Sequence, residues 1–313
     1  MIKIEKGNLS CAEIEGVISL YSRVIPEHKR DIRYYNWLNK VVYPETITAV
    51  CYHNKKVIGH YAIHKSKCQL DNNTEIVIGY GTQAVLDPEY NNSVSIFDIS
   101  SYCLELAKCD GIQVVYGFPN NNYALIQEKI ERWDKIKKID AVNLNYKKFE
   151  NNSDLDFTEV NDITDLKKCL DNIKNINPNN KIKIIRDSNY YINRYLKKPT
   201  NNYLIYKVTR GKNILGLIFT KYYQDNFYHL VDSLYDNSEV CYNQIVKIFL
   251  TTNYKKKTVS IWDVPERIRK DHEESKGFKT HFLSKNLSLK NDVYCRLLDY
   301  NLWQLQLGDS DAF

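Results

Sequence analysis

Two histidines lie close enough in the sequence to form a small chemical site. His60 and His64 flank Ala62 in the run GHYAIHK, where a β-strand would place both imidazoles on one face of the sheet. Such a pair could bind a metal, or His60 could act as a base or bind a substrate in a cleft. Because no third ligand motif lies nearby, we favour two histidines on a half-solvated sheet face.

Asp232 is the acid whose setting most suggests a function. It interrupts the apolar run HLVDSLYD, and a carboxylate in such a strand is costly unless it is paired or faces water. We therefore expect Asp232 to face a cleft, where it could bind a cationic amine or serve as a general base. The alternative is a structural acid paired inside its own domain. Asp263, beside Trp262, is a weaker candidate of the same kind.

Three further residues are candidates for contacts with a second substrate. Asp309 and Asp311 flank Ser310 near the end of the chain, and Asp309 could also serve as a base. Trp37, in the run YYNWLNKVVYP, offers an aromatic surface for a ring-shaped substrate, although a single tryptophan is more often part of a core.

The elements that must position these residues are clearest between residues 79 and 123. A β-type run at 82–86 ends at the turn Asp87-Pro88-Glu89-Tyr90, because the proline fixes its backbone angle. Apolar residues then recur at helical spacing from Ile96 to Leu106, and Gly111 provides a stop. A second strand follows at 112–119. Two strands joined by one helix form a crossover unit.

This order of elements resembles the GNAT superfamily of acyl-CoA N-acyltransferases. The run GFPN at 117–120 and the run GDSDAF at 308–313 are similar to those of two-domain members encoded with bacterial surface-polysaccharide (lipopolysaccharide and O-antigen) genes. The resemblance covers most of the chain. It implies an α/β fold with two tandem GNAT-like domains, each a mixed twisted sheet flanked by helices.

The resemblance also implies roles for particular residues. The backbone of Gln83, Ala84 and Val85 receives the pantetheine arm and points N–H groups at the thioester carbonyl. Asn120 and Tyr123 lie beside the thiol, where Tyr123 can act as the catalytic acid. The pyrophosphate is held by the loop after Tyr90, whose residues here are Asn91, Asn92, Ser93, Val94 and Ser95.

That loop departs from the family pattern, which is rich in glycine. Backbone N–H groups close around a diphosphate most easily where glycine allows positive φ. Asn92 tolerates positive φ and could keep part of this arrangement, but the β-branched Val94 should not. Either the side chains of Asn92, Ser93 and Ser95 hold the pyrophosphate more loosely, which we favour, or the domain has lost the cofactor.

The second half of the chain repeats the first. Two β runs at 203–220 parallel those at 47–63, and the runs 227–234 and 258–265 correspond to the strands on either side of the crossover helix. Helices are predicted at 239–253 and at 266–277, the second with Gly277 as its stop.

A polar segment separates the two halves. Because residues 149–162 show no sustained apolar period, we place the domain boundary near residue 152, with a CoA-binding domain at 1–152 and an acceptor-side domain at 153–313. The first domain should open with a helix that starts at a capping box, Ser10-x-x-Glu13, and ends at Pro26.

Composition favours a cytoplasmic enzyme. No run reaches the roughly 18 apolar residues of a membrane span, and residues 1–5 lack the apolar core of a signal peptide. The 8 cysteines contain no C-x-x-C pair, so they suit buried positions in a reducing compartment. The net charge of +6 is modest. Its densest cluster, Lys255-Lys256-Lys257, is best interpreted as the solvated end of a helix rather than an RNA site.

These observations together predict a CoA-dependent sugar N-acyltransferase. The acyl group passes from acyl-CoA to the primary amine of a nucleotide-linked amino sugar, such as a dTDP-amino-dideoxyhexose, by direct attack and without a metal. Neither nucleic acid nor membrane insertion is expected. The sequence leaves the assembly open, with a homodimer among the options. Two alternatives remain: an aminoacyl-tRNA-dependent peptidyl transferase of similar fold, and a non-catalytic scaffold with a degenerate CoA site.

Overall fold

The structure is a computed structural model of the 313-residue chain. It describes residues 1–26, 30–71, 74–146, 154–173, 181–200, 203–224, 227–235, 248–249, 258–262 and 272–310. The chain forms two compact units. The first comprises Met1–Lys137, Ile182–Ile185 and His281–Trp303, and the second comprises Lys138–Lys181, Arg186–Thr280 and Gln304–Phe313.

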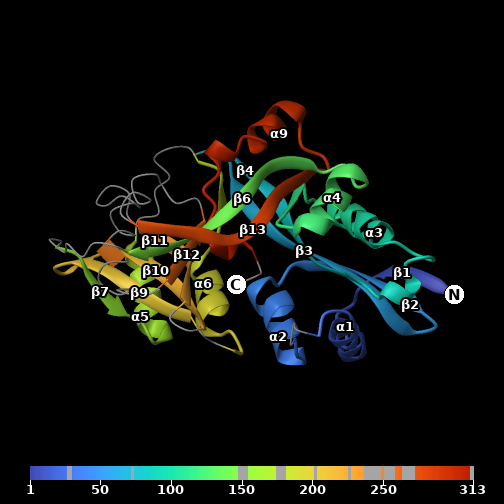
Figure 1. Ribbon diagram of the computed structural model, residues 1–313, viewed down its shortest axis with the longest axis horizontal. Helices are drawn as coiled ribbons and strands as arrows, with labels where there is room; N and C mark the ends of the chain where they lie inside the picture. Colours follow the sequence, from blue (N-terminus) through green and yellow to red (C-terminus); the bar gives the residue numbers. More distant parts are fainter. Residues whose placement is uncertain are drawn as a thin grey trace. The chain divides into compact units, whose positions relative to one another are not determined.

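The first unit is a mixed sheet with helices on both faces (Figure 1). Its strand order is β1-β2-β3-β4-β5-β13, and β8 pairs with the end of β3. Among the described strand pairs of this order, β4 and β5 run parallel and the others antiparallel, as the predicted crossover requires. Its elements are β1 (Ile2–Lys6), α1 (Cys11–Val24), α2 (Ile32–Asn36), the π-helix η1 (Trp37–Val42), β2 (Thr46–His53), β3 (Lys56–Gln69), β4 (Glu75–Leu86), the 3-10 turn η2 (Pro88–Tyr90), α3 (Ile96–Cys109), β5 (Val114–Gly117), α4 (Asn121–Lys129), β8 (Lys183–Ile185), α9 (Asn291–Leu297) and the 3-10 turn η4 (Tyr300–Leu302).

Two apolar layers hold these helices to the sheet. The α1 layer includes Val17 and Leu20, which pack against Val50 and Val85 of the sheet. The α3 layer on the other face includes Cys103, with Ile99 and Ala107. All members of both layers are at most 8% exposed, so each helix buries an almost dry face.

The second unit repeats the strand pattern with other segments. Its order is β6-β12-β11-β10-β9-β7, and of these described pairs β11 and β12 run parallel while the others run antiparallel. Each unit thus takes its sixth strand out of sequence, β13 in the first and β6 in the second. Its elements are β6 (Asp134–Tyr146), β7 (Asp156–Glu159), α5 (Ile163–Asn172), α6 (Ser188–Tyr191), the π-helix η3 (Ile192–Leu196), β9 (Tyr203–Arg210), β10 (Asn213–Gln224), β11 (Phe227–Tyr235), β12 (Thr258–Trp262) and the 3-10 turn η5 (Leu307–Asp309). The strand β13 spans His272–Asn286 and pairs with β5 of the first unit through Leu283–Asn286.

The mixed α/β fold class is confirmed, and three local predictions need correction. The chain opens with β1, and the predicted helix follows it as α1 with Ser10 as the confirmed N-cap. The predicted helix at 266–277 is wrong over residues 272–277, which belong to β13, and residues 266–271 lie outside the described residues. Glu13 accepts hydrogen bonds from Asn8 and Leu9 instead of closing the capping box on Ser10.

Other sequence expectations have separate outcomes. The hairpins at 46–69 and 203–224 are confirmed, as is the helix that stops at Gly111, whose φ is +83°. Of the predicted helix at 239–253, only residues 248–249 are described. Residues 147–153 lie outside the description, so a boundary near residue 152 stays a prediction. No helix in the described ranges is long and apolar enough to cross a membrane.

Candidate functional site

The predicted thioester-binding backbone is a β-bulge in β4. The pairing of β4 with β3 shifts by one residue between His60 and Ala62, and Gln83 takes up the extra residue with φ of +57°. A left-handed glutamine is strained and must be held by its neighbours. Parallel pairing of β4 with β5 covers only Ile78–Tyr80. The bulge therefore lies where the two strands have stopped pairing.

Buried polar side chains hold this bulge in place. The Tyr21 hydroxyl donates to the Gln83 carbonyl at 2.9 Å, and the His60 ring Nδ1 lies 3.3 Å from the same oxygen. The Gln83 amide donates to Asn39 Oδ1 at 2.9 Å. A carbonyl only accepts, so His60 carries its proton on Nδ1 and Nε2 accepts from Tyr35, 2.9 Å away. The network fixes both the backbone and the side chain of Gln83.

His60 is a neutral positioning group in this network. It is fully buried, and burial lowers its pKa to about 4. His64 is also fully buried, with its ring stacked on Tyr43 at 4.2 Å. The interpretation of a half-solvated face was therefore wrong. Trp37 is only 4% exposed, on η1, as expected for a core residue. Substrate contacts of His60 and Trp37 stay predictions.

The predicted pyrophosphate loop already satisfies most of its own backbone. The N–H groups of Ser93 and Val94 both donate to the Tyr90 carbonyl. At the start of α3, the Asp98 carboxylate accepts from the Ser95 N–H and the Ser95 hydroxyl, each at 2.7 Å, and Ser95 Oγ accepts from the Asp98 N–H. This reciprocal capping box places a carboxylate where a phosphate oxygen would bind.

The conformation of the loop differs from the expectation in one respect. Asn92 does not adopt positive φ, so it does not keep the part of the anion-binding backbone arrangement that its residue type would allow. Val94 is 8% exposed and packs into the α3 layer, in line with its β-branched side chain. Asn91 N–H donates to the Pro88 carbonyl at 3.3 Å. Pyrophosphate binding by 91–95 stays a prediction that rests on side chains.

Tyr123 lies on α4, one turn after the residue that caps the helix. Asn120 Oδ1 accepts from the Tyr123 N–H at 2.9 Å, so Asn120 acts here as the N-cap. The Tyr123 hydroxyl donates to Glu131 at 3.2 Å, and the Ser100 hydroxyl donates to the same oxygen at 2.8 Å. Burial and the nearby Glu131 raise the pKa of Tyr123 well above 10. The hydroxyl therefore stays protonated at neutral pH and keeps a proton to donate.

Asp232 and Asp309 meet in the second unit at a buried arginine. Arg186 donates to Asp232 at 2.7 Å and also forms an ion pair with Asp309. Tyr195 donates to Asp232 at 2.8 Å, and Asp232 is fully buried. The expectation that Asp232 faces water is therefore wrong, and its alternative, a paired structural acid, describes its surroundings. Roles in catalysis or acceptor binding stay untested predictions.

The segment that carries Asp309 is tied along β11. Ser233 and Gln306 exchange hydrogen bonds of 2.9 Å, and Arg194 donates to the Ser310 carbonyl at 3.0 Å. A side chain at Gly308 would come within 2.6 Å of the Tyr195 hydroxyl, so only glycine fits without movement. Asp311, Asp263 and the Lys255–Lys257 cluster lie outside the described residues.

A short motif that the sequence reasoning missed occurs once in each unit. R-D-x-x-Y-Y occurs at Arg30–Tyr35 and again at Arg186–Tyr191. In each copy the aspartate side chain caps a helix by accepting a 2.7 Å hydrogen bond from the backbone N–H of the first tyrosine of the motif. Each helix then continues as a π-helix. A search of the sequence for short patterns that occur twice would have found the motif.

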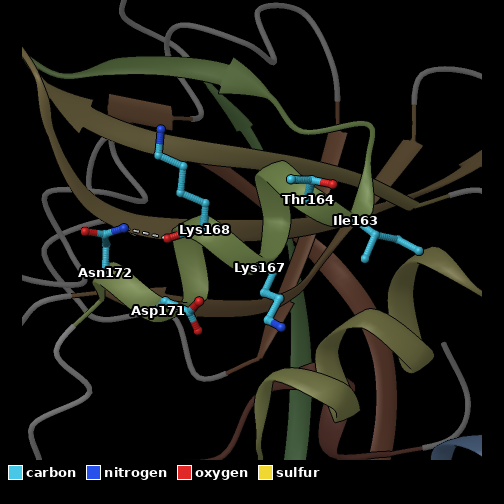
Figure 2. A pocket seen from close by; sticks show the side chains of 6 residues that line it. All are labelled: Ile163, Thr164, Lys167, Lys168, Asp171 and Asn172. Carbon is cyan, nitrogen blue, oxygen red and sulfur yellow. Dashed lines mark hydrogen bonds between the residues drawn. The ribbon is translucent and has the colours of Figure 1, made fainter.

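Two pockets in the described parts of the chain are lined by other residues. One of about 360 Å³ lies along a single helix, α5, between Ile163 and Asn172, with its lysines directed outward (Figure 2). Another of about 320 Å³ lies beside α1, lined by residues that include Arg23, Lys55 and Lys56. No group of three potential metal ligands occurs within the described ranges.

Comparison with known proteins identifies the fold. No protein-family model matches the chain, and no curated protein matches its sequence. Solved structures match most of it: GCN5-related N-acetyltransferases from Anabaena variabilis (12% identity, TM-score 0.66, 91% of this chain and 73% of that one) and Kribbella flavida (8%, 0.64, 91% and 71%), and Eis1 from Mycobacterium abscessus (9%, 0.63, 91% and 73%). At these identities the likeness shows the fold alone: the chain has the fold of the GCN5-related N-acetyltransferases.

Proposed function

We propose that the first unit transfers an acyl group from acyl-CoA to a primary amine. The observation that carries this proposal is the bulge at Gln83, held in a left-handed conformation beyond the end of the β4–β5 pairing. A fixed backbone at a gap between strands can direct N–H groups at a developing oxyanion without reorganisation during the reaction. The fold of the solved neighbours agrees with this chemistry.

The reaction is a direct displacement at the thioester carbon. The neutral amine attacks the carbonyl, the oxyanion receives hydrogen bonds from N–H groups near Ala84 and Val85, and the carbon–sulfur bond then breaks. The amine loses a proton to water, and the CoA sulfur gains one from Tyr123 or from water. Tyr123 is protonated at neutral pH, which suits a donor but makes it a weak acid.

The pyrophosphate end fits less well than the thioester end. Asp98 already occupies the start of α3, so we propose that side chains of Asn92 and Ser93 hold the diphosphate only loosely. This capping box is also the observation that favours the second candidate function, a binding protein with a degenerate CoA site.

The finer parts of the proposal come from the sequence resemblance. We take the acceptor to be a nucleotide-linked amino sugar of surface-polysaccharide synthesis and the reaction to be cytoplasmic, and we take the two units to be two copies of one domain. The aminoacyl-tRNA-dependent alternative would use the same amine chemistry, and only that enzyme requires RNA, whose binding weakens steeply with salt.

Removal of the Tyr123 hydroxyl tests the proposal. We expect Tyr123→Phe to lower kcat about tenfold or more in a free-thiol release assay with acetyl-CoA and amine acceptors, because a transition-state proton donor is lost. The matched control is Ser100→Ala, which removes the other hydroxyl bound to Glu131. Equal effects of the two variants would assign Tyr123 a structural role. Wild-type protein that neither binds CoA nor releases thiol would instead support the binding protein.

A further inference from the structure

A buried carboxyl group lies beside the proposed proton donor in the first unit. Glu131 follows the end of α4 and is only 4% exposed. The hydroxyls of Tyr123 and Ser100 both donate to its Oε1, at 3.2 Å and 2.8 Å. These contacts fix the carboxyl group of Glu131 against the residue that the proposed reaction uses as an acid.

This carboxyl group lies next to the point where β4 and β5 stop pairing. A glycine follows the last parallel pair on each strand, Gly81 in β4 and Gly117 in β5. A Cβ at Gly81 would lie 2.6 Å from the Tyr61 hydroxyl, and one at Gly117 would lie 3.8 Å from the Trp133 ring. The Tyr61 side chain also interacts electrostatically with Glu131. Tyr61 therefore links the buried carboxyl to the gap between the strands.

The surroundings of Glu131 make it the group that changes charge. Burial raises the pKa of Glu131 above its ordinary value of 4.5, and hydrogen bonds from its neighbours offset this only in part. Lys285 from β13 also faces it, but donates to the backbone carbonyls of Glu131 and Arg132, at 2.8 Å and 3.1 Å. Burial keeps the pKa of Tyr61 from β3 and of Tyr123 from α4 well above 10. Both phenols therefore stay protonated where Glu131 titrates.

The charge of Glu131 decides the direction of its hydrogen bond with Tyr123. An ionised carboxylate can only accept, so it holds the phenolic proton of Tyr123 and keeps it from other acceptors. A protonated carboxyl can donate to the Tyr123 oxygen instead, which leaves the phenolic proton available to a third group. A neutral carboxyl is also the form that burial favours.

We propose that Glu131 is a positioning residue for the proton of Tyr123: protonated Glu131 donates to the Tyr123 oxygen and turns the phenolic proton toward the leaving sulfur. The inference rests on the proposed acyl transfer. As the carbon–sulfur bond breaks, the Tyr123 O–H bond breaks and an S–H bond forms, while the Glu131 proton moves to the Tyr123 oxygen. Water returns a proton to Glu131 after CoA leaves.

The pH dependence of turnover tests the inference. Free-thiol release with acetyl-CoA and an amine acceptor gives kcat from pH 5 to pH 8.5 for the wild type and for Glu131→Gln, whose amide keeps a donor at every pH. The ratio of variant to wild type removes the ionisation of the amine, which both enzymes share. We expect this ratio to rise about tenfold or more with pH, because only the wild type loses its donor.

A matched variant and a second substitution sharpen this test. Glu128→Gln changes another acid of α4, which is paired with Lys135, and its ratio to wild type should not change with pH. Ser100→Ala removes a donor from ionised Glu131, so the fall of kcat attributed to Glu131 should move to higher pH. A ratio for Glu131→Gln that does not change with pH would overturn the inference, even if thiol is released.

Infrared spectroscopy detects the same hydrogen bond without turnover. At pH 5 the difference spectrum between wild type and Glu131→Gln should contain the carbonyl band of one protonated carboxyl. In Tyr123→Phe this band should move to higher frequency, because the carboxyl proton has lost its acceptor. That shift in a protein that releases no thiol would support the hydrogen bond and count only against acyl transfer. The absence of the band, or a band that Tyr123→Phe leaves in place, would overturn the inference.

Discussion

Gln83 in the bulge of β4 and Asp232, directly after the bulge of β11, are held by different chemistry. In the first unit, Gln83 is surrounded by neutral hydrogen-bonding groups, with His60 kept uncharged by burial. In the second unit, Asp232 is held by a buried arginine that also binds Asp309. Neutral networks tolerate the entry of a ligand with little electrostatic cost, whereas a buried ion pair loses much when one partner moves. The comparison agrees with the proposal that the reaction takes place in the first unit, and it predicts that the ion pair of the second unit stabilises the fold.

The largest expected effect comes from replacing Asp232 by a neutral residue, as Gln83 is. Asp232→Asn leaves the buried Arg186 with one carboxylate fewer, and we expect the free energy of unfolding to fall by roughly 3 kcal/mol. Urea unfolding at pH 7 measures it. Asp156→Asn, an exposed position on β7, is the control and should change stability little. A loss below 1 kcal/mol for Asp232→Asn would mean that the ion pair does not stabilise the second unit.

Lowering the pH should change the contributions of His60 and Asp309 to the free energy of unfolding in opposite directions. The pKa of His60 is about 4 in the folded state and 6.5 in the reference state, so between these values only the unfolded chain takes up the proton and stability falls as pH falls. Burial raises the pKa of Asp309 from 3.8 to about 6, so in that range only the folded chain takes up the proton and stability rises as pH falls.

Single variants reveal these opposing contributions, each on the order of 3 kcal/mol from the cited pKa differences. Burial also lowers the pKa of His229 to about 4, so the variants are compared with the wild type. Relative to the wild type, His60→Gln should lose a fall in unfolding free energy between pH 6.5 and pH 4, and Asp309→Asn should lose a rise between pH 6 and pH 4. Urea titrations at four or five pH values provide the slopes. Identical slopes in both variants would remove the contrast between the units.

The smallest expected effect concerns the start of α3. Asp98→Ala removes the capping box, so we expect a loss of about 1 kcal/mol in stability together with tighter CoA binding, because a negative charge leaves the proposed diphosphate site. Thermal unfolding and calorimetry with CoA measure the two effects. Glu105→Ala, exposed on the same helix, controls for the loss of a surface acid. Unchanged CoA affinity would move the pyrophosphate away from residues 91–95.

Local features were predictable where neighbouring residues determine them. The turn at Pro88, the stop at Gly111 and the paired hairpins follow from turn chemistry and apolar period, and the structure contains all of them. The capping box of α3 was also present in the sequence as Ser95-x-x-Asp98, and reading it would have shown that the anion position was already filled.

Other features required contacts between residues far apart in the chain. Arg186 and Asp309 are 123 residues apart, and no local pattern indicates that they pair. The exchange of β6 and β13 between the units is equally non-local, because a strand carries the same apolar alternation whichever sheet it joins.

The sequence by itself determined the elements, the crossover unit and the candidate residues, since periodicity and turn residues act over a few positions. Only the tertiary structure decided which of those residues are buried together and which side chain satisfies each one. Asp232 could equally have faced water or an arginine, and Gln83 could have been an ordinary strand residue. Burial, which depends on the whole fold, made the first a paired acid and the second a strained bulge.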